Sequence, residues 1–303
     1  MSKSKQFAAF VLALTAATTL LAESRCPGNV ESLAYRQLNR HQIVVPVSIN
    51  HSGPYSFLLD TGTQMTIIDP GLAGELQLAT HGQASVASAG VHAAASLADV
   101  DLVEAGSQRA PGLKVLVFDI GIIQGKTIGV RGVLGEDFLE QFDLLIDNAH
   151  HMVCLDNQGR MRAEVKGRHV ELLDQVAGKG SQLAAPPIVS VRFRDELRPV
   201  HLELDSGADV CFLFSAPAHL ALGSFRIDSP VGSGVTGKLQ TFTNLPAQDI
   251  RIDSVEISKV PFVTLLGAQK DPHTRDYDGL LSLGLFKRVL IAHADHFAIL
   301  DPW

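Results

Sequence analysis

Apolar and polar residues alternate in two stretches of the chain that lie about 145 residues apart. The first stretch contains Val45, Val47 and Ile49, and the second contains Val189, Val191 and Phe193. A period of two is typical of a half-buried β-strand. Turn-forming triplets follow both stretches, at residues 51–53 (HSG) and 194–196 (RDE), so each stretch predicts the first strand of a hairpin.

Both returning strands end in the same kind of triplet, Asp-Thr/Ser-Gly. Residues 57–62 read FLLDTG and residues 202–207 read LELDSG, which separates Asp60 from Asp205 by 205 − 60 = 145 residues. The same spacing relates LIDNAHHMVCLD (145–156) to LIAHADHFAILD (290–301), and a spacing of 147 relates GVLGEDFL (132–139) to GLLSLGLF (279–286). Self-similarity at one spacing indicates an internal repeat.

Further elements recur in the same order after each triplet. Short helices are predicted to start at Asp69-Pro70, where Asp is a good N-cap and Pro a good first residue, and at Ser215. Gly- and Ser-containing hairpin tips follow at ASAGV (87–91) and VGSGV (231–235), where small residues let the backbone bend. The chain therefore predicts two β-rich lobes, at residues 41–157 and 187–303, joined by a polar connector at 158–186.

The first 40 residues are expected to lie outside the lobes. Lys3 and Lys5 precede an apolar run of 16 residues (7–22), and small residues then follow near position 24. A membrane-spanning helix needs roughly 20 apolar residues, so a cleaved export signal at 1–24 is favoured over an uncleaved anchor. A periplasmic or secreted protein is the resulting expectation. Residues 25–40 form a lead-in to which the pattern assigns no role.

Composition narrows the classes of partner. The net charge is −7, with no run of Lys or Arg, so a nucleic-acid-binding surface is not expected. Neither the three cysteines nor the histidines near 150 and 293 have the spacing of a metal site, and the histidines are interpreted as strand residues. Cys154 and Cys211 lie in apolar runs that favour buried thiols, whereas the pairing of Cys26 stays open.

The two triplets could form one catalytic site if the lobes pack about a pseudo-twofold axis. Asp60 and Asp205 would then face each other, and two close carboxylates share one proton rather than both ionising. Such a pair holds a base and an acid at the same pH, as direct hydrolysis of an amide requires. Gly62 and Gly207 would allow close backbone approach. The hydroxyls of Thr61 and Ser206 could bond across the junction.

These motifs make the chain resemble the pepsin and retropepsin superfamily of aspartic peptidases. It is similar in particular to bacterial retropepsin-like aspartyl proteases that carry two copies in one exported chain. The resemblance rests on LLDTGT, ELDSGA, the later Val133-Leu134-Gly135 element and the two Gly-containing flaps. It implies an all-β, two-lobed fold of acid-protease barrels with a few short helices.

The resemblance also implies a set of site residues. Asp60 and Asp205 would be catalytic, supported by Thr61, Gly62, Ser206 and Gly207. Flaps would cover an extended peptide or protein substrate, with their tips at Ser88, Ala89, Gly90 and Val91 and at Gly232, Ser233, Gly234 and Val235. No cofactor or metal is expected. A monomer is expected, because one chain supplies both lobes.

The two copies differ in ways that bear on this interpretation. Ser282 stands where the family pattern has Gly, and neither flap carries a Tyr. Thr63 follows the first triplet but Ala208 follows the second, so a hydroxyl could favour the ionised form of Asp60 and leave the shared proton on Asp205. A peptide-binding protein on the same fold that does not cut is the alternative. A structural β protein would require the paired triplets to be coincidence.

Overall fold

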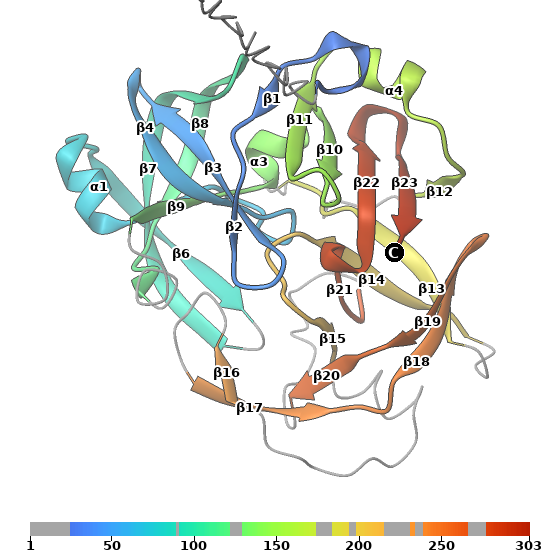
Figure 1. Ribbon diagram of the computed structural model, residues 1–303. Helices are drawn as coiled ribbons and strands as arrows, with labels where there is room; N and C mark the ends of the chain where they lie inside the picture. Colours follow the sequence, from blue (N-terminus) through green and yellow to red (C-terminus); the bar gives the residue numbers. More distant parts are fainter. Residues whose placement is uncertain are drawn as a thin grey trace, which may run out of the picture.

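The computed structural model describes residues 25–88, 91–121, 129–173, 184–193, 198–214, 231–233, 239–265 and 277–303 (Figure 1). The predicted export signal, the turn at 194–196 and the helix expected at Ser215 lie outside these residues. The described chain is mostly strand, arranged in three sheets, and confirms the predicted all-β class.

The first lobe is one eight-stranded sheet. In spatial order its strands are β2 (Arg36–Leu38), β3 (Gln42–Ile49), β4 (Ser52–Leu59), β9 (Val130–Leu134), β5 (Ile67–Ile68), β8 (Gln108–Val117), β7 (Val91–Ala105) and β6 (Thr80–Ser88). An additional pairing of β3 with β7, at Ile49 and Val103, closes the sheet on itself.

The second lobe is a nine-stranded sheet. Its order is β16 (Val231–Ser233), β17 (Leu239–Asn244), β20 (Phe262–Leu265), β15 (Cys211–Leu213), β21 (Gly279–Ser282), β14 (Val200–Asp205), β13 (Ile188–Phe193), β18 (Gln248–Ile252) and β19 (Val255–Val260). From β13 to β16 this order repeats that of the first lobe from β3 to β6. The long strands β7 and β8 each have two shorter counterparts, β17 with β18 and β19 with β20.

The first predicted hairpin is confirmed, with its turn shifted by one residue. Ile49 of β3 pairs with Ser52 of β4, so the turn residues are Asn50 and His51, both with positive φ. The alternating residues of β3 are buried as predicted. The start of the strand is covered on both faces, however, because Val44 packs in a second apolar cluster with Leu58.

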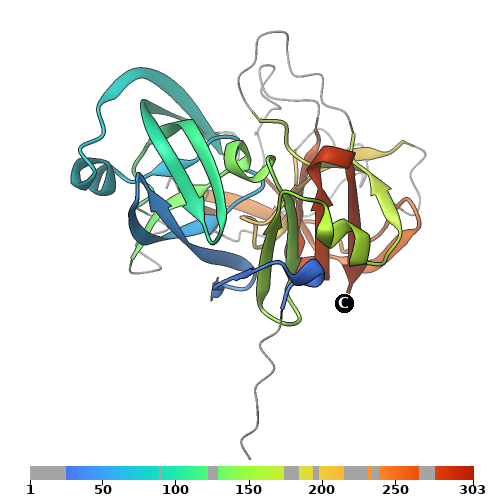
Figure 2. The ribbon, with the colours of Figure 1, turned by 90° about the horizontal axis from the view of Figure 1, so that it is seen from above.

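A third sheet, of six strands, joins the two halves. Its order is β1 (Ser32–Leu33), β11 (Met152–Asp156), β10 (Asp143–Asp147), β22 (Phe286–Ala292), β23 (Phe297–Pro302) and β12 (His169–Glu171). Figure 1 shows β10 and β11 in green beside β22 and β23 in red, and Figure 2 shows the same strands from above, with the first lobe on the left. Leu145 pairs directly with Leu290, so residues related by the 145-residue repeat meet at the centre of the sheet.

The helices are short and lie between strands. They are α1 (Pro70–Glu75), α3 (Glu136–Leu139), α4 (Arg160–Glu164) and the 3-10 turns η1 (Pro27–Asn29), η2 (Leu283–Leu285) and η3 (His293–Asp295). Asp69 caps α1 by accepting from the N–H groups of Gly71 and Leu72, which confirms the predicted start of this helix. None of the described helices has the length and apolar character needed to cross a bilayer.

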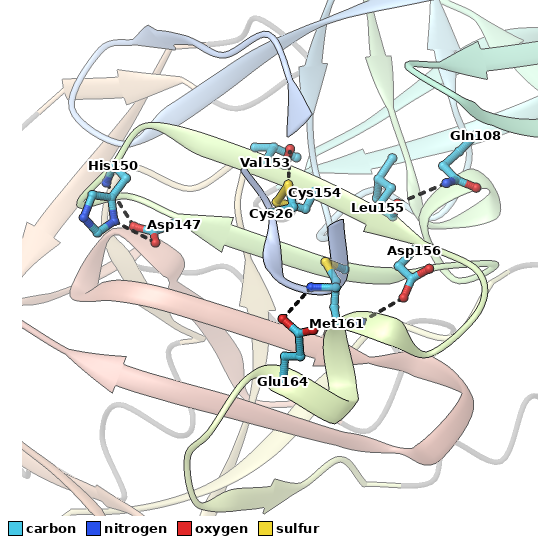
Figure 3. Close-up of a disulfide and its surroundings, with 11 residues drawn as sticks. Cys26, Gln108, Asp147, His150, Val153, Cys154, Leu155, Asp156, Met161 and Glu164 are labelled. Atoms are coloured by element: carbon cyan, nitrogen blue, oxygen red, sulfur yellow. Dashed lines mark hydrogen bonds and ion pairs between the residues drawn. A yellow bond between two sulfur atoms is a disulfide. The ribbon is translucent and has the colours of Figure 1, made fainter. Parts of the chain in front are cut away.

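The lead-in and the connector cover the outer face of the six-stranded sheet. A disulfide joins Cys26 to Cys154 of β11, so the interpretation of Cys154 as a free thiol is wrong, while Cys211 is free and buried as expected (Figure 3). The N–H of Gly28 donates to the Glu164 carboxylate on α4 (2.8 Å). The connector therefore holds regular structure, α4 and β12, up to residue 173.

Candidate active site

Asp60 and Asp205 occupy equivalent places at the ends of β4 and β14. Each of these strands runs parallel to a neighbour, β9 under the first and β21 under the second. The Asp60 N–H donates to the Leu134 carbonyl (3.0 Å), and Asp205 pairs with Ser282 in the second sheet. Both aspartates are only 6% exposed. Each carboxyl group therefore stands on a buried strand end that a parallel neighbour supports.

Hydrogen bonds of Thr61 and Ser206 join the two loops across the pseudo-twofold axis. The Thr61 hydroxyl donates to the Leu204 carbonyl (2.6 Å), and the Ser206 hydroxyl donates to the Leu59 carbonyl (2.9 Å). Each hydroxyl oxygen also accepts from the opposite backbone, from Ser206 N–H at 3.0 Å and from Thr61 N–H at 3.1 Å. The structure thus places Thr61 and Ser206 where the sequence interpretation needs them, and it holds the loops in one fixed relation.

Gly62 and Gly207 each lie against the carboxyl group of the opposite loop. A Cβ at Gly62 would stand 2.7 Å from Cγ of Asp205, and one at Gly207 would stand 2.5 Å from Cγ of Asp60. Both distances are shorter than any tolerable contact, so the approach of the two aspartates requires glycine at both positions.

The two carboxyl groups lie close together, each against the glycine of the opposite loop, and each accepts hydrogen bonds from its own loop. Asp60 accepts from Gly62 N–H (2.9 Å) and from the Thr63 hydroxyl (2.8 Å). Asp205 accepts from two backbone N–H groups instead, those of Gly207 (2.7 Å) and Ala208 (2.9 Å). The structure therefore brings the predicted pair together, with a hydroxyl donor on the Asp60 side alone.

Burial raises the pKa of both carboxyl groups above the ordinary value for aspartate. For Asp60, desolvation is the largest cause of the raised pKa, and the Thr63 hydroxyl opposes it. For Asp205, desolvation and then the neighbouring Asp60 charge raise the pKa well above its usual range. These directions favour Asp60 as the member of the pair that ionises more easily, and the placement of the shared proton on Asp205 stays a prediction.

Ser282 fits beneath Asp205 although its counterpart beneath Asp60 is a glycine. A Cβ at Gly135 would lie 2.7 Å from the Thr63 carbonyl oxygen, which instead accepts from Glu136 N–H (2.7 Å). In the second half, the Ser282 hydroxyl donates to the carbonyl of Ala208 (2.6 Å). A side-chain donor therefore does in one half what a backbone donor does in the other.

The two predicted flaps are hairpins of equivalent strands. In the first, β6 pairs with β7 up to Ser88 and Val91, and in the second, β16 pairs with β17 up to Ser233 and Leu239. Ala89, Gly90, Gly234 and Val235 lie outside the described residues. Contact of either tip with a substrate stays a prediction.

Sequence reasoning missed residues that reach the opposite catalytic loop from outside the triplets. Gln42 donates from Nε2 to the Gly207 carbonyl (2.6 Å), and the N–H of His41 donates to Asp209 (3.1 Å). Gln42 is the first residue of β3 and His41 precedes it, and their polar character breaks the apolar alternation. That break in the pattern could have marked these two residues as unusual. It could not have identified their partners, which lie some 165 residues away along the chain.

The histidines considered for a metal site have separate partners. His150 contacts Asp147 (2.9 Å), and His293 contacts the buried Glu136 (3.2 Å). Within the described residues, no group of three or more His, Cys, Asp or Glu side chains is arranged to hold a metal ion.

Comparisons with known proteins agree with this geometry. Residues 45–138 match the family described as aspartyl protease. Among solved structures, the crystal structure of aspartic proteinase from Irpex lacteus aligns with a TM-score of 0.53 at 12% identity, over 90% of this chain and 97% of the other. No curated protein shows significant sequence similarity to the chain. The chain therefore has the fold of a pepsin-like aspartic proteinase, and its first lobe is similar to the aspartyl protease family.

Proposed function

We propose that this protein is an aspartic endopeptidase in which Asp60 and Asp205 form the catalytic pair. The observation that carries the proposal is the close approach of two buried carboxyl groups, one from each half and each lying against the glycine of the opposite loop. A protein that only bound peptides would not need two desolvated carboxyl groups in contact, since burying ionisable groups costs stability.

In the proposed reaction each of the two carboxyl groups acts once as a base and once as an acid. The Asp60 carboxylate takes a proton from a water molecule while the water oxygen attacks the peptide carbonyl carbon. Asp205 gives its proton to the carbonyl oxygen. The tetrahedral diol then collapses. Asp60 returns its proton to the leaving nitrogen while Asp205 removes one from a diol hydroxyl. The C–N bond breaks, and both carboxyl groups regain their starting protonation.

The substrate we propose is an extended polypeptide segment held between the dyad and the two flaps. The flaps are hairpins whose described strands lead toward tips of small residues, so the main chain of the substrate is the natural partner for them. Both loops come from one chain and are tied by Thr61 and Ser206, so we expect a monomer to be active.

The test is hydrolysis of a mixed peptide library from acidic to neutral pH, followed by mass spectrometry of the products. We expect internal cleavage that a statine-type inhibitor blocks, and a loss of about 10²–10⁴-fold in rate in Asp60→Asn and in Asp205→Asn. Asp209→Asn is the matched control, since Asp209 lies four residues beyond Asp205 and, among the residues that the structure describes, accepts a hydrogen bond from the His41 N–H. Cleavage that persists in both dyad variants would refute the proposal. Binding without turnover in the unmodified protein would favour the peptide-binding alternative.

We also propose that the protein is exported to the periplasm or beyond. The support is the buried disulfide between Cys26 and Cys154, since disulfides persist in oxidising compartments. Fractionation of cells that produce the full chain, with sequencing of the mature amino terminus, tests this. A cytoplasmic protein that retains residues 1–24 would contradict it.

A further inference from the structure

One buried ionisable pair lies outside the dyad. Glu136, the first residue of α3, is fully buried, and its Oε2 lies 3.2 Å from Nε2 of His293, the first residue of η3. Nδ1 of His293 lies 2.6 Å from the Phe142 carbonyl oxygen. Apart from this contact, neither Glu136 carboxylate oxygen has a hydrogen-bond partner among the residues that the structure describes.

The geometry allows the pair to hold one proton between Nε2 and the carboxylate. A carbonyl oxygen can only accept, so Nδ1 carries a hydrogen that it donates to Phe142. With one further proton, Nε2 and the carboxylate attract each other, whichever of them carries it. With two further protons the buried pair carries a net positive charge, and with none it carries a net negative charge, and either charge is costly to bury. The arrangement with one shared proton is therefore favoured.

The backbone of Glu136 connects this pair to the dyad. Its N–H donates to the Thr63 carbonyl (2.7 Å), and the Thr63 hydroxyl donates to Oδ2 of Asp60 (2.8 Å). The position of Glu136 thus influences the donor that favours ionisation of Asp60. Both carboxyl groups are also buried, so water screens the charge of either one only weakly.

The other half of the molecule has an uncharged contact at the equivalent place. By the 145-residue spacing His293 corresponds to Asn148, and by the 147-residue spacing Glu136 corresponds to Leu283. The Asn148 amide donates to the carbonyls of Phe286 (2.9 Å) and Leu283 (3.2 Å). In the second half, a neutral amide therefore stands where the first half has the Glu136–His293 pair. The fold does not require an ionisable pair at this place.

We propose that Glu136 and His293 are positioning residues that regulate the dyad, because their shared proton controls how readily Asp60 gives up its own. This inference rests on the proposed peptidase function. The Glu136 carboxylate lies on the segment that hydrogen-bonds to the Asp60 loop. A negative charge there disfavours ionisation of Asp60, so the enzyme is active only at a higher pH.

Other charged groups face the pair and enter the same balance. They are Glu140 at the end of α3, Asp60, Asp143 on β10, Arg162 on α4 and Asp295 on η3. Arg162 contacts both Asp143 (2.7 Å) and Asp295, so these two carboxylates have a cation of their own that does not involve the Glu136–His293 proton. Desolvation raises the pKa of Glu136, and the adjacent Glu136 carboxylate raises that of His293, against the effect of its own burial.

The kinetic test compares pH profiles of kcat/KM on one peptide chosen from the library. Glu136→Gln keeps a donor to Nε2 but removes the charge, and we expect its kcat/KM on the acid limb to rise at least threefold over that of the unmodified enzyme. Asn148→Ala is the control, because it removes the uncharged contact and should lower Tm without moving either limb. Should Glu136→Gln fail to fold, the double variant Glu136→Leu/His293→Asn copies the other half and should show the same acid-limb gain.

A second readout does not depend on turnover. Because coupling between two sites is reciprocal, Asp60→Asn should shift the titration midpoint of the His293 ring, followed by NMR of the imidazole C–H signals. If no peptide is cleaved, the proposed function fails while this titration still decides the present inference. An unchanged His293 midpoint in Asp60→Asn, or an acid limb of Glu136→Gln that superimposes on that of the unmodified enzyme, would overturn it.

Discussion

At the scale of single residues, the two aspartates of this pair differ because of one hydroxyl group. The Thr63 side chain donates to Asp60, whereas the equivalent Ala208 offers only its backbone N–H to Asp205. The sequence predicted this asymmetry from the identities of the two residues. Only the structure shows that the hydroxyl does reach the carboxylate.

Thr63→Ala should move the acid limb of the pH–rate profile to higher pH. A hydrogen bond to a charged acceptor contributes about 1.5–3 kcal/mol, so kcat/KM on the acid side should fall roughly tenfold or more. Thr63→Ser retains the hydroxyl and serves as the control. An acid limb that does not move in Thr63→Ala would show that this hydroxyl does not favour the ionised form of Asp60.

Asp205→Asn should make the protein more stable while it removes activity. The folded-state pKa of Asp205 is raised, so its contribution to stability is complete below the unfolded-state pKa and is lost as pH rises through the folded-state pKa. The neutral amide does not suffer this loss. Thermal unfolding should therefore give a higher Tm for the variant at neutral to alkaline pH, by about 2–4 °C for each kcal/mol, with the difference shrinking toward acidic pH. Equal Tm values across the range would contradict the assignment of the proton to Asp205.

At the scale of elements, each catalytic loop rests on the end of a parallel strand. The strands, the first hairpin and the cap of α1 could be predicted because alternation, turn residues and capping are encoded within a few neighbouring positions. The path beneath Asp205 could not, since Ser282 departs from the glycine pattern. Its fit depends on the Ala208 carbonyl, 74 residues away.

Reciprocal substitutions at these two positions should have unequal effects. Gly135→Ser would place a Cβ 2.7 Å from the Thr63 carbonyl oxygen, so we expect at least a hundredfold loss of kcat/KM and a clear fall in Tm. Ser282→Gly loses the two hydrogen bonds of the Ser282 hydroxyl, to the Ala208 carbonyl and from the Gly284 N–H, which together cost about 1–3 kcal/mol, and it should keep measurable activity. Parallel measurement of Tm and kcat/KM for both variants decides the matter. If Gly135→Ser changed neither Tm nor kcat/KM, the backbone segments beneath Asp60 and Asp205 would be interchangeable.

At the scale of the whole molecule, the halves are joined by a sheet to which both contribute, and a disulfide attaches the lead-in to the outer face of that sheet. The S–S bond links positions 128 residues apart and lies in the apolar cluster over that sheet, away from the dyad loops. It therefore holds the lead-in against the strands that unite the lobes.

Removing the disulfide should lower stability but preserve the chemistry. Cys26→Ser/Cys154→Ser is expected to lose about 2–4 kcal/mol, with kcat/KM at room temperature within about twofold of the unmodified enzyme. A reducing agent should lower Tm in the unmodified protein and in Cys211→Ala, but not in the double variant. A reductant-sensitive Tm in the double variant would show that the effect comes from another source.

The sequence by itself determined the duplication, the β class, the paired triplets and the asymmetry around them, because these follow from periodicity, spacing and residue identity along the chain. Tertiary structure decided which distant groups meet. It pairs Cys26 with Cys154, Glu136 with His293 and Leu145 with Leu290, and it packs α4 of the connector against the lead-in. Such contacts depend on how whole sheets pack about the pseudo-twofold axis, and no local pattern of hydrophobic and polar residues records that packing.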